Sequence, residues 1–132
     1  MMRLKTDLVD VMLAATEPGP HGKLDQIELQ WDRRTALGVV MAAQGYPLQP
    51  RKGDVVTGLP KAVEDACVFH AGTTLVDGQV LTSGGRVLCV TVLADNVRLA
   101  QQRAYEVAAG IRFDGVQYRT DIGYRAIKGA AV

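Results

Sequence analysis

Three residues at the start of an apolar segment, Gly84, Gly85 and Arg86, form the first candidate site of the sequence. A glycine pair ahead of a strand can let backbone N–H groups approach a phosphate, and an adjacent arginine can add a charged bidentate contact. The alternative is structural, because a hairpin turn or a strand bend also needs glycine. The sequence has neither the lysine of a Walker-type loop nor a GxGxxG spacing, so the motif alone does not decide between an anion site and a turn.

A second candidate lies near the C-terminus, at Asp121, Gly123 and Arg125. The acid and the base, four residues apart, can form a structural ion pair, or Arg125 can contribute to a site for an anionic ligand. His70 lies in an apolar, strand-like segment, where a histidine can bind a ligand or transfer a proton. No acid is placed with it as in a catalytic triad, so a structural role for His70 is the favoured interpretation.

The two cysteines, Cys67 and Cys89, both lie in apolar segments with a strand pattern. Neither belongs to a CxxC motif or has a histidine partner at metal-site spacing. We therefore expect buried free thiols and no metal site.

A β-hairpin is predicted immediately upstream of Gly84. The apolar runs 68–75 and 79–82 flank a turn at Asp77 and Gly78. Asp and Gly tolerate the positive φ angles that tight hairpin turns need, so we give these two residues a structural role.

A strand and a helix follow the glycine pair. Residues 86–93 (RVLCVTVL) are almost all apolar and rich in β-branched side chains, which predicts a central strand covered on both faces. Residues 97–111 carry apolar side chains at every third or fourth position, which predicts a helix capped by Asp95 or Asn96. This helix would cover one face of the strand.

The N-terminal part of the chain predicts one helix over residues 6–15, capped by Thr6 and ended by Pro18 and Gly19. Its apolar stripe consists of Leu8, Val9, Met12 and Leu13. The other segments predict a loop at 18–22, a short helix at 23–31, a buried strand at 36–43, a turn at 44–47, an exposed loop at 49–57, one helical turn at 59–64 and loop-like structure over 113–132.

These elements predict an α+β fold: an antiparallel sheet of three to five strands with helices mainly on one face, preceded by one helix.

The composition limits the classes of function that the chain can have. Fifteen basic and fourteen acidic residues give a net charge of +1, and only 5% of the residues are aromatic, so we expect no nucleic-acid partner. No apolar run approaches 18 residues, so we expect no membrane segment and a cytoplasmic location.

Seven segments of the sequence together resemble the C-terminal part of the phosphoribosylamine–glycine ligases, an ATP-grasp family. They are MMRLKTDLVD, LGVVMAAQGYP, RKGDVVTGLP, VFHAGT, TSGGRVLCVT, AQQRAYEVAAGIRFDG and YRTDIGYRA. Their order is that of the family and they span residues 1 to about 127, so the resemblance is specific.

The resemblance implies part of an enzyme of purine biosynthesis. The family activates glycine as an acyl phosphate with ATP and Mg²⁺ or Mn²⁺, and the amine of phosphoribosylamine then displaces the phosphate. Residues 1–22 would be a helix and loop from the end of the ATP-grasp region, and residues 23–132 the C-terminal domain. The family's metal-binding strand would precede Met1, so we expect no ATP or metal site and no catalytic residue in this chain, which would be inactive alone.

The partners implied are the N-terminal and ATP-grasp domains, in the same polypeptide or a separate one. Gly84, Gly85 and Arg86, and Asp121, Gly123 and Arg125, lie in loops that would face the active-site cleft, where they would contact the ribose 5-phosphate or the other domains. His70 and Tyr46 would be structural. The N-terminal helix, separated from its sheet, would expose its stripe or associate with a second copy. The alternative is a stand-alone, non-catalytic binding module with the same fold.

Overall fold

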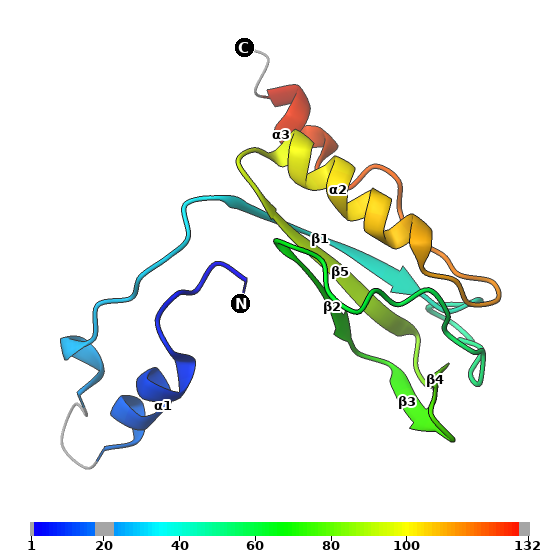
Figure 1. The fold of residues 1–132 in the computed structure, drawn as a ribbon, viewed down its shortest axis with the longest axis horizontal. Coiled ribbons are helices and arrows are strands. Elements are labelled where there is room, and N and C mark those ends of the chain that lie inside the picture. The colour runs from blue at the N-terminus through cyan, green and yellow to red at the C-terminus, as the bar shows by residue number, and fades with distance from the viewer. Residues whose placement is uncertain (1, 18–22, 130–132) are drawn as a thin grey trace.

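The computed structural model describes residues 2–17 and 23–129, so the loop predicted at 18–22 lies outside the described residues. The fold is α+β, as predicted, and Figure 1 shows its arrangement. Its elements are α1 (Leu8–Thr16), the short 3-10 helix η1 (Leu24–Gln26), β1 (Thr35–Ala42), β2 (Ala66–His70), β3 (Thr73–Val76), β4 (Gln79–Thr82), β5 (Arg86–Ala94), α2 (Val97–Gly110) and α3 (Tyr124–Gly129).

The main sheet has three antiparallel strands in the order β1-β5-β2, so β5 is central, as predicted. Strands β3 and β4 form a separate two-stranded hairpin. Its turn has positive φ at both Asp77 (49°) and Gly78 (77°), which confirms the structural role predicted for this pair.

The single strand predicted over residues 68–75 is wrong, because it is interrupted at Ala71 and Gly72. The carbonyl of Gly72 accepts hydrogen bonds from the N–H groups of Ser83 (2.8 Å) and Gly84 (3.2 Å). A Cβ on Gly72 would lie 2.7 Å from the Cα of Gly84. The chain bends here because the backbones that join β2 to β3 and β4 to β5 touch each other.

Helix α2 covers one face of the main sheet through a row of small residues. Ala100, Ala104 and Ala108 are fully buried against β1 and β5. Their spacing of four places them on one side of the helix, and their small side chains let it lie close to the sheet. Asn96 caps the helix by accepting a hydrogen bond from the N–H of Leu99 (2.9 Å).

We expect Ala104→Leu to lower the free energy of unfolding by about 1–3 kcal/mol, because the larger side chain has no space between α2 and the sheet. Ala109→Leu, at an exposed position of the same helix, is the matched control. Chemical denaturation of both variants measures the difference. Equal stabilities would show that α2 does not pack as described.

The face of the main sheet opposite α2 is open, which corrects the prediction that β5 is covered on both sides. Val40 of β1 and Phe69 of β2 flank Cys89 of β5, and they are 43% and 41% exposed. We call this surface the open sheet face. It consists of Gly38, Val40, Cys67, Phe69, Cys89 and Thr91.

Residues 2–32 form an arm beside the sheet domain (Figure 1). Residues Lys5 and Asp32 pair with the opposite strand-like segment of the arm through backbone hydrogen bonds of 2.9 and 2.7 Å. Asp7, not Thr6, caps α1, because its carboxylate accepts from the N–H of Val9, while the Thr6 hydroxyl accepts from the N–H of Gln30. The helix predicted over 23–31 is wrong, since only the short η1 forms and the chain then extends to pair back.

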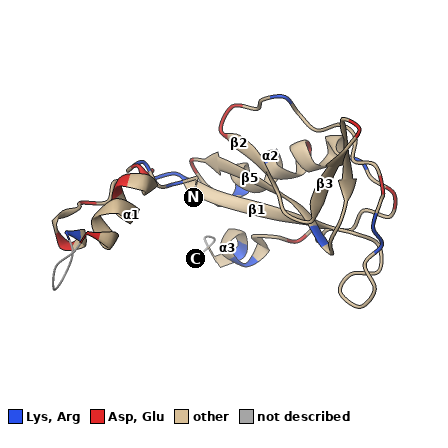
Figure 2. Ribbon diagram, turned by 90° about the horizontal axis from the view of Figure 1, so that it is seen from below, with Lys and Arg blue, Asp and Glu red and all other residues tan. Residues whose placement is uncertain are grey.

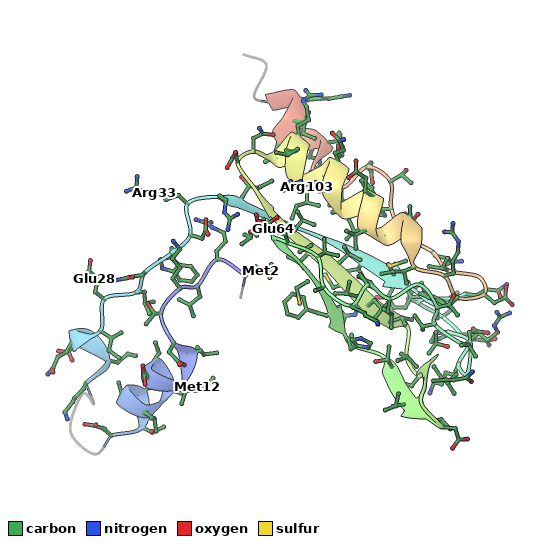
Figure 3. All side chains as sticks on the ribbon, in the orientation of Figure 1. Met2, Met12, Glu28, Arg33, Glu64 and Arg103 are labelled. Carbon is green, nitrogen blue, oxygen red and sulfur yellow. The ribbon has the colours of Figure 1, made fainter. Side chains whose placement is uncertain are left out.

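The apolar stripe of α1 is exposed in the single chain, which is one of the two outcomes expected for it. Val9, Met12 and Leu13 are each more than half exposed, and Figure 3 places Met12 far from the main sheet. No helix in residues 2–17 or 23–129 is long and apolar enough to cross a membrane.

An ion-pair cluster joins the arm to the sheet domain. The guanidinium of Arg34 donates to Asp32 (2.9 Å) and to Asp65 (2.7 Å). Hydrogen bonds from the side chain and then the backbone N–H of Arg34 lower the pKa of Asp32 from 3.8 to about 2.

This shift predicts an acid-sensitive contribution of Asp32. A carboxyl group whose pKa is lowered in the folded state stabilises the protein above about pH 4, and this contribution is lost as the pH falls toward 2. We therefore expect Asp32→Asn to lower the melting temperature at pH 6 but to have little effect at pH 2. Glu28→Gln, at an exposed position of the arm, controls for the loss of one charge (Figure 3). A difference that does not change between pH 6 and pH 2 would contradict the account.

Two other local predictions are wrong. The helical turn predicted at 59–64 is absent; Val63 instead bridges to Ala66 around Asp65, whose φ is 57°. The segment 113–132 is not entirely loop-like, because α3 forms over Tyr124–Gly129 beside α2.

Candidate functional site

Arg86 stands at the start of β5, on the rim of an open hollow of about 630 Å³ that we call the Arg86 groove. Its lining residues are Val40, Tyr46, Pro47, Pro50, Ala71, Gly72, Gly85, Arg86, Leu88 and Cys89. The floor is the end of the open sheet face, and the turn that follows β1 forms one wall. The groove is therefore largely apolar with one cation at its edge.

Tyr46 forms part of this wall, although the sequence predicted only a structural role for it. Its ring packs so closely on Gly85 that a Cβ there would overlap it. Tyr46 is nevertheless 42% exposed and lines the groove. Gly85 is thus required by the contact with Tyr46, and its carbonyl accepts a hydrogen bond from the N–H of Ala43 (2.8 Å).

Gly84 does not offer its N–H to a ligand, since that group donates to the carbonyl of Gly72. The structure therefore favours the alternative left open by the sequence, in which the glycine pair serves backbone packing. Arg86 remains the only charged group of the motif.

Arg119 is a residue of this region that sequence reasoning missed. A second hollow of about 460 Å³ shares Val40, Tyr46 and Arg86 with the groove and adds Ala42, Gln117, Tyr118 and Arg119 to its lining. The sequence contains a signal for it, because Arg119 lies in the segment YRTDIGYRA, two residues before the candidate residue Asp121. Two arginines from distant parts of the chain thus border adjoining hollows.

Asp121 pairs with Arg119 and not with Arg125, so the ion pair considered from the sequence is not formed. Two hydrogen bonds of 2.8 and 2.6 Å join the Arg119 guanidinium to the Asp121 carboxylate, and they lower the pKa of Asp121. Arg125 instead donates to the Tyr124 hydroxyl (3.1 Å) and lies over that ring.

Helix α2 holds the segment that carries Arg119. The Tyr105 hydroxyl donates to the carbonyl of Arg119 (2.8 Å) and accepts from the N–H of Ile122 (3.0 Å). Gln101 donates to the carbonyl of Ile122 (2.6 Å). Three hydrogen bonds from α2 side chains thus fix the backbone between Arg119 and Ile122.

Gly123 and Arg125 lie away from the Arg86 groove. A Cβ on Gly123 would meet the side chains of Leu37 and Val97. Leu37 and Ala42, the partner of Arg86, are five residues apart on β1, or about 17 Å at the rise of a strand. The two candidate motifs therefore do not form one site.

His70 and the cysteines provide no assembled chemistry in the described residues. His70 is exposed at the end of β2, with Nδ1 3.0 Å from the Thr73 hydroxyl. Cys67 and Cys89 are free and half-buried, rather than fully buried as expected. No three His, Cys, Asp or Glu side chains converge as metal ligands within residues 2–17 and 23–129.

The sequence of the sheet domain matches a known family. A model of the phosphoribosylglycinamide synthetase C domain matches residues 36–125, which covers β1 through the start of α3. The chain belongs to this family. The match includes Arg86, Arg119 and the open sheet face.

The sequence of this chain is similar to those of phosphoribosylamine–glycine ligases. One from Ralstonia nicotianae is 63% identical over 97% of this chain, and one from Vibrio parahaemolyticus is 55% identical over 96%. A solved phosphoribosylamine–glycine ligase from Thermotoga maritima has the same fold, with a TM-score of 0.62 and 40% identity; the match covers 73% of this chain and 23% of that one. The chain spans about 29% of the length of the two curated relatives.

Proposed function

We propose that this chain is the C-terminal domain of a phosphoribosylamine–glycine ligase, which acts in purine biosynthesis. The ligase forms a C–N bond: ATP phosphorylates the glycine carboxylate, and the amine of 5-phosphoribosylamine displaces the phosphate to give an amide. The observation that carries this proposal is the 63% identity to such a ligase over 97% of the chain. Because the chain spans 29% of that ligase, the reaction belongs to the larger protein, and the chain alone is inactive.

We assign the Arg86 groove to the ribose 5-phosphate of the substrate. Arg34, Arg51 and Arg119 are each paired with aspartates, whereas Arg86 forms no ion pair with the described residues. An exposed guanidinium without a carboxylate partner keeps its charge and its donors for an anion. Arg119 lines the adjoining hollow, but Asp121 balances its charge, so Arg86 is the guanidinium that we assign to the phosphate.

A competing role for Arg86 is to bind a carboxylate of the neighbouring ligase domains, which would fit the same geometry. Gly123 and Arg125, at the other end of β1, are assigned to contact with these domains and not to the phosphate. In this assignment residues 1–22, which include the exposed α1, belong to the end of the ATP-grasp region, and residues 23–132 form the C-terminal domain.

The sites for ATP and for Mg²⁺ or Mn²⁺ would lie in the rest of the ligase. The described residues include no converging set of metal ligands, and we assign no catalytic step to them.

A growth experiment tests the proposed function. The hybrid ligase is the Ralstonia nicotianae enzyme in which this chain replaces the matching 128 residues. We expect the hybrid ligase to restore growth without purines to a bacterium that lacks this enzyme, and the chain alone to fail. If a stably produced hybrid did not restore growth where the parent did, the stand-alone binding module would be the better interpretation.

A further inference from the structure

The loop that follows β1 forms one wall of the Arg86 groove, and we call its residues 44–51 the wall loop. Tyr46, Pro47 and Pro50 of this loop line the groove. The ring of Tyr46 also packs on the glycine that precedes Arg86. The position of the wall loop relative to Arg86 therefore sets the shape of the groove.

Backbone hydrogen bonds close the wall loop on itself. The N–H of Arg51 donates to the carbonyl of Gln44 (2.8 Å), and the N–H of Gln49 donates to the carbonyl of Gly45 (2.9 Å). Gly45 has a φ of 81°, and a Cβ there would overlap the Gln49 carbonyl. These contacts fix the shape of the loop, whereas its position on the domain depends on what holds its two ends.

The first end of the wall loop continues β1, and the side chain of Arg51 holds the second end. Strands β1 to β4 carry no Lys, Arg, Asp or Glu, so the ion pairs near the groove lie in the loops (Figure 2). Nε of Arg51 donates to one carboxylate oxygen of Asp54 (2.9 Å), and Nη2 lies 2.9 Å from the other oxygen. Nη2 is also 2.5 Å from the carboxylate of Asp114. Arg51 thus contacts two carboxylates, one of them through both oxygens.

The partners of Arg51 belong to two other parts of the domain. The N–H of Asp54 donates to the Thr82 hydroxyl (3.0 Å), and its carbonyl accepts from the Thr82 N–H (2.9 Å). Thr82 is buried at the end of β4. Asp114 lies in the segment that follows α2. The guanidinium of Arg51 therefore joins the wall loop to β4 and to the end of the helical layer.

We propose that Arg51 is a positioning residue for the Arg86 groove, because its pairs with Asp54 and Asp114 hold the wall loop at a fixed distance from Arg86. The proposal rests on the proposed function. Arg51 is not among the residues that line the groove, so it acts on the sugar phosphate through the wall loop. A groove that is formed before the substrate arrives binds it more tightly, since no loop has to be ordered on binding.

Amide hydrogen exchange in the isolated chain tests the structural part of the proposal. We expect Arg51→Ala to speed exchange in the wall loop by at least about tenfold and to leave exchange in α2 unchanged, which also verifies that the variant is folded. Lys52→Ala removes an exposed cation next to Arg51 and is the matched control. Unchanged exchange in the wall loop of Arg51→Ala would overturn the proposal.

Steady-state kinetics of the hybrid ligase tests the effect on the substrate. We expect Arg51→Ala to raise the KM for phosphoribosylamine roughly tenfold with little change in kcat, because the phosphate contact is misplaced while the reacting groups are not. Arg51→Lys keeps the charge but not the two-oxygen contact with Asp54, so its KM should lie between those of the parent and of Arg51→Ala. Lys52→Ala should leave KM unchanged. A fall in kcat without a rise in KM would overturn the proposal.

The double variant Arg51→Ala, Arg86→Ala shows whether Arg51 acts through Arg86. If it does, the second substitution adds little, and the KM of the double variant should be within about threefold of that of Arg86→Ala alone. If the two increases in KM multiply, Arg51 acts independently of Arg86 and the proposal is wrong.

The kinetic outcomes separate this proposal from the proposed function. A hybrid ligase that is inactive before any further substitution would overturn the proposed function. An active hybrid ligase whose KM does not change in Arg51→Ala would keep the proposed function and overturn the role of Arg51.

Discussion

Replacing Arg86 by alanine in the hybrid ligase is expected to raise the KM for phosphoribosylamine by about 10- to 100-fold. A hydrogen bond to a charged group contributes about 1.5–3 kcal/mol, which corresponds to this range. Because the 5-phosphate is remote from the amine that reacts, kcat at saturating substrate should change much less. Steady-state kinetics with varied phosphoribosylamine measures both constants.

Two further variants control for this result. Arg86→Lys keeps the charge without the bidentate geometry, so its KM should lie between those of the parent and of Arg86→Ala. Arg103→Ala removes an exposed arginine from α2, on the other side of the sheet, and should leave KM unchanged (Figure 3). An unchanged KM in Arg86→Ala, together with a lower melting temperature of the hybrid ligase, would show that Arg86 fastens the domain to its neighbour.

Met41→Ala is expected to lower the free energy of unfolding by about 2–5 kcal/mol. Met41 is fully buried on β1, in the cluster that also contains Val87, Ile111 and Phe113. Truncation removes its buried methylene and thioether contacts and leaves a cavity that the sheet and α2 cannot close. Urea denaturation of the isolated chain measures the change.

Met12→Ala provides a matched control with the same chemical change. Met12 is 56% exposed on α1, so its truncation should change the stability by less than about 0.5 kcal/mol. If both variants lost equal stability, Met12 would be covered in solution, and the association of α1 predicted for the isolated chain would explain it.

The sequence predicted best those elements whose cause is local. The hairpin turn follows from Asp77 and Gly78, whose positive φ angles are properties of the residues themselves. Strand β5 and helix α2 follow from hydrophobic periodicity, and both form close to the predicted bounds.

The features that were missed depend on contacts between distant segments. The break after His70 exists because Gly72 touches Gly84, which no local pattern reveals. Asp121 has an arginine close by on each side in the sequence, Arg119 and Arg125, and it pairs with Arg119. Only the path of the backbone decides between these two partners. The apolar pattern of β5 predicted that both of its faces are covered. Such a pattern indicates burial but does not show which segment covers each face.

The measurement that tests the central claim most directly is the formation of glycinamide ribonucleotide by the purified hybrid ligase. We expect product and ADP to appear together, only with glycine and phosphoribosylamine present, at a kcat/KM within about tenfold of the parent enzyme. The isolated chain should form neither. A folded hybrid ligase without this activity, assayed beside an active parent, would contradict the assignment of this chain as the ligase's C-terminal domain.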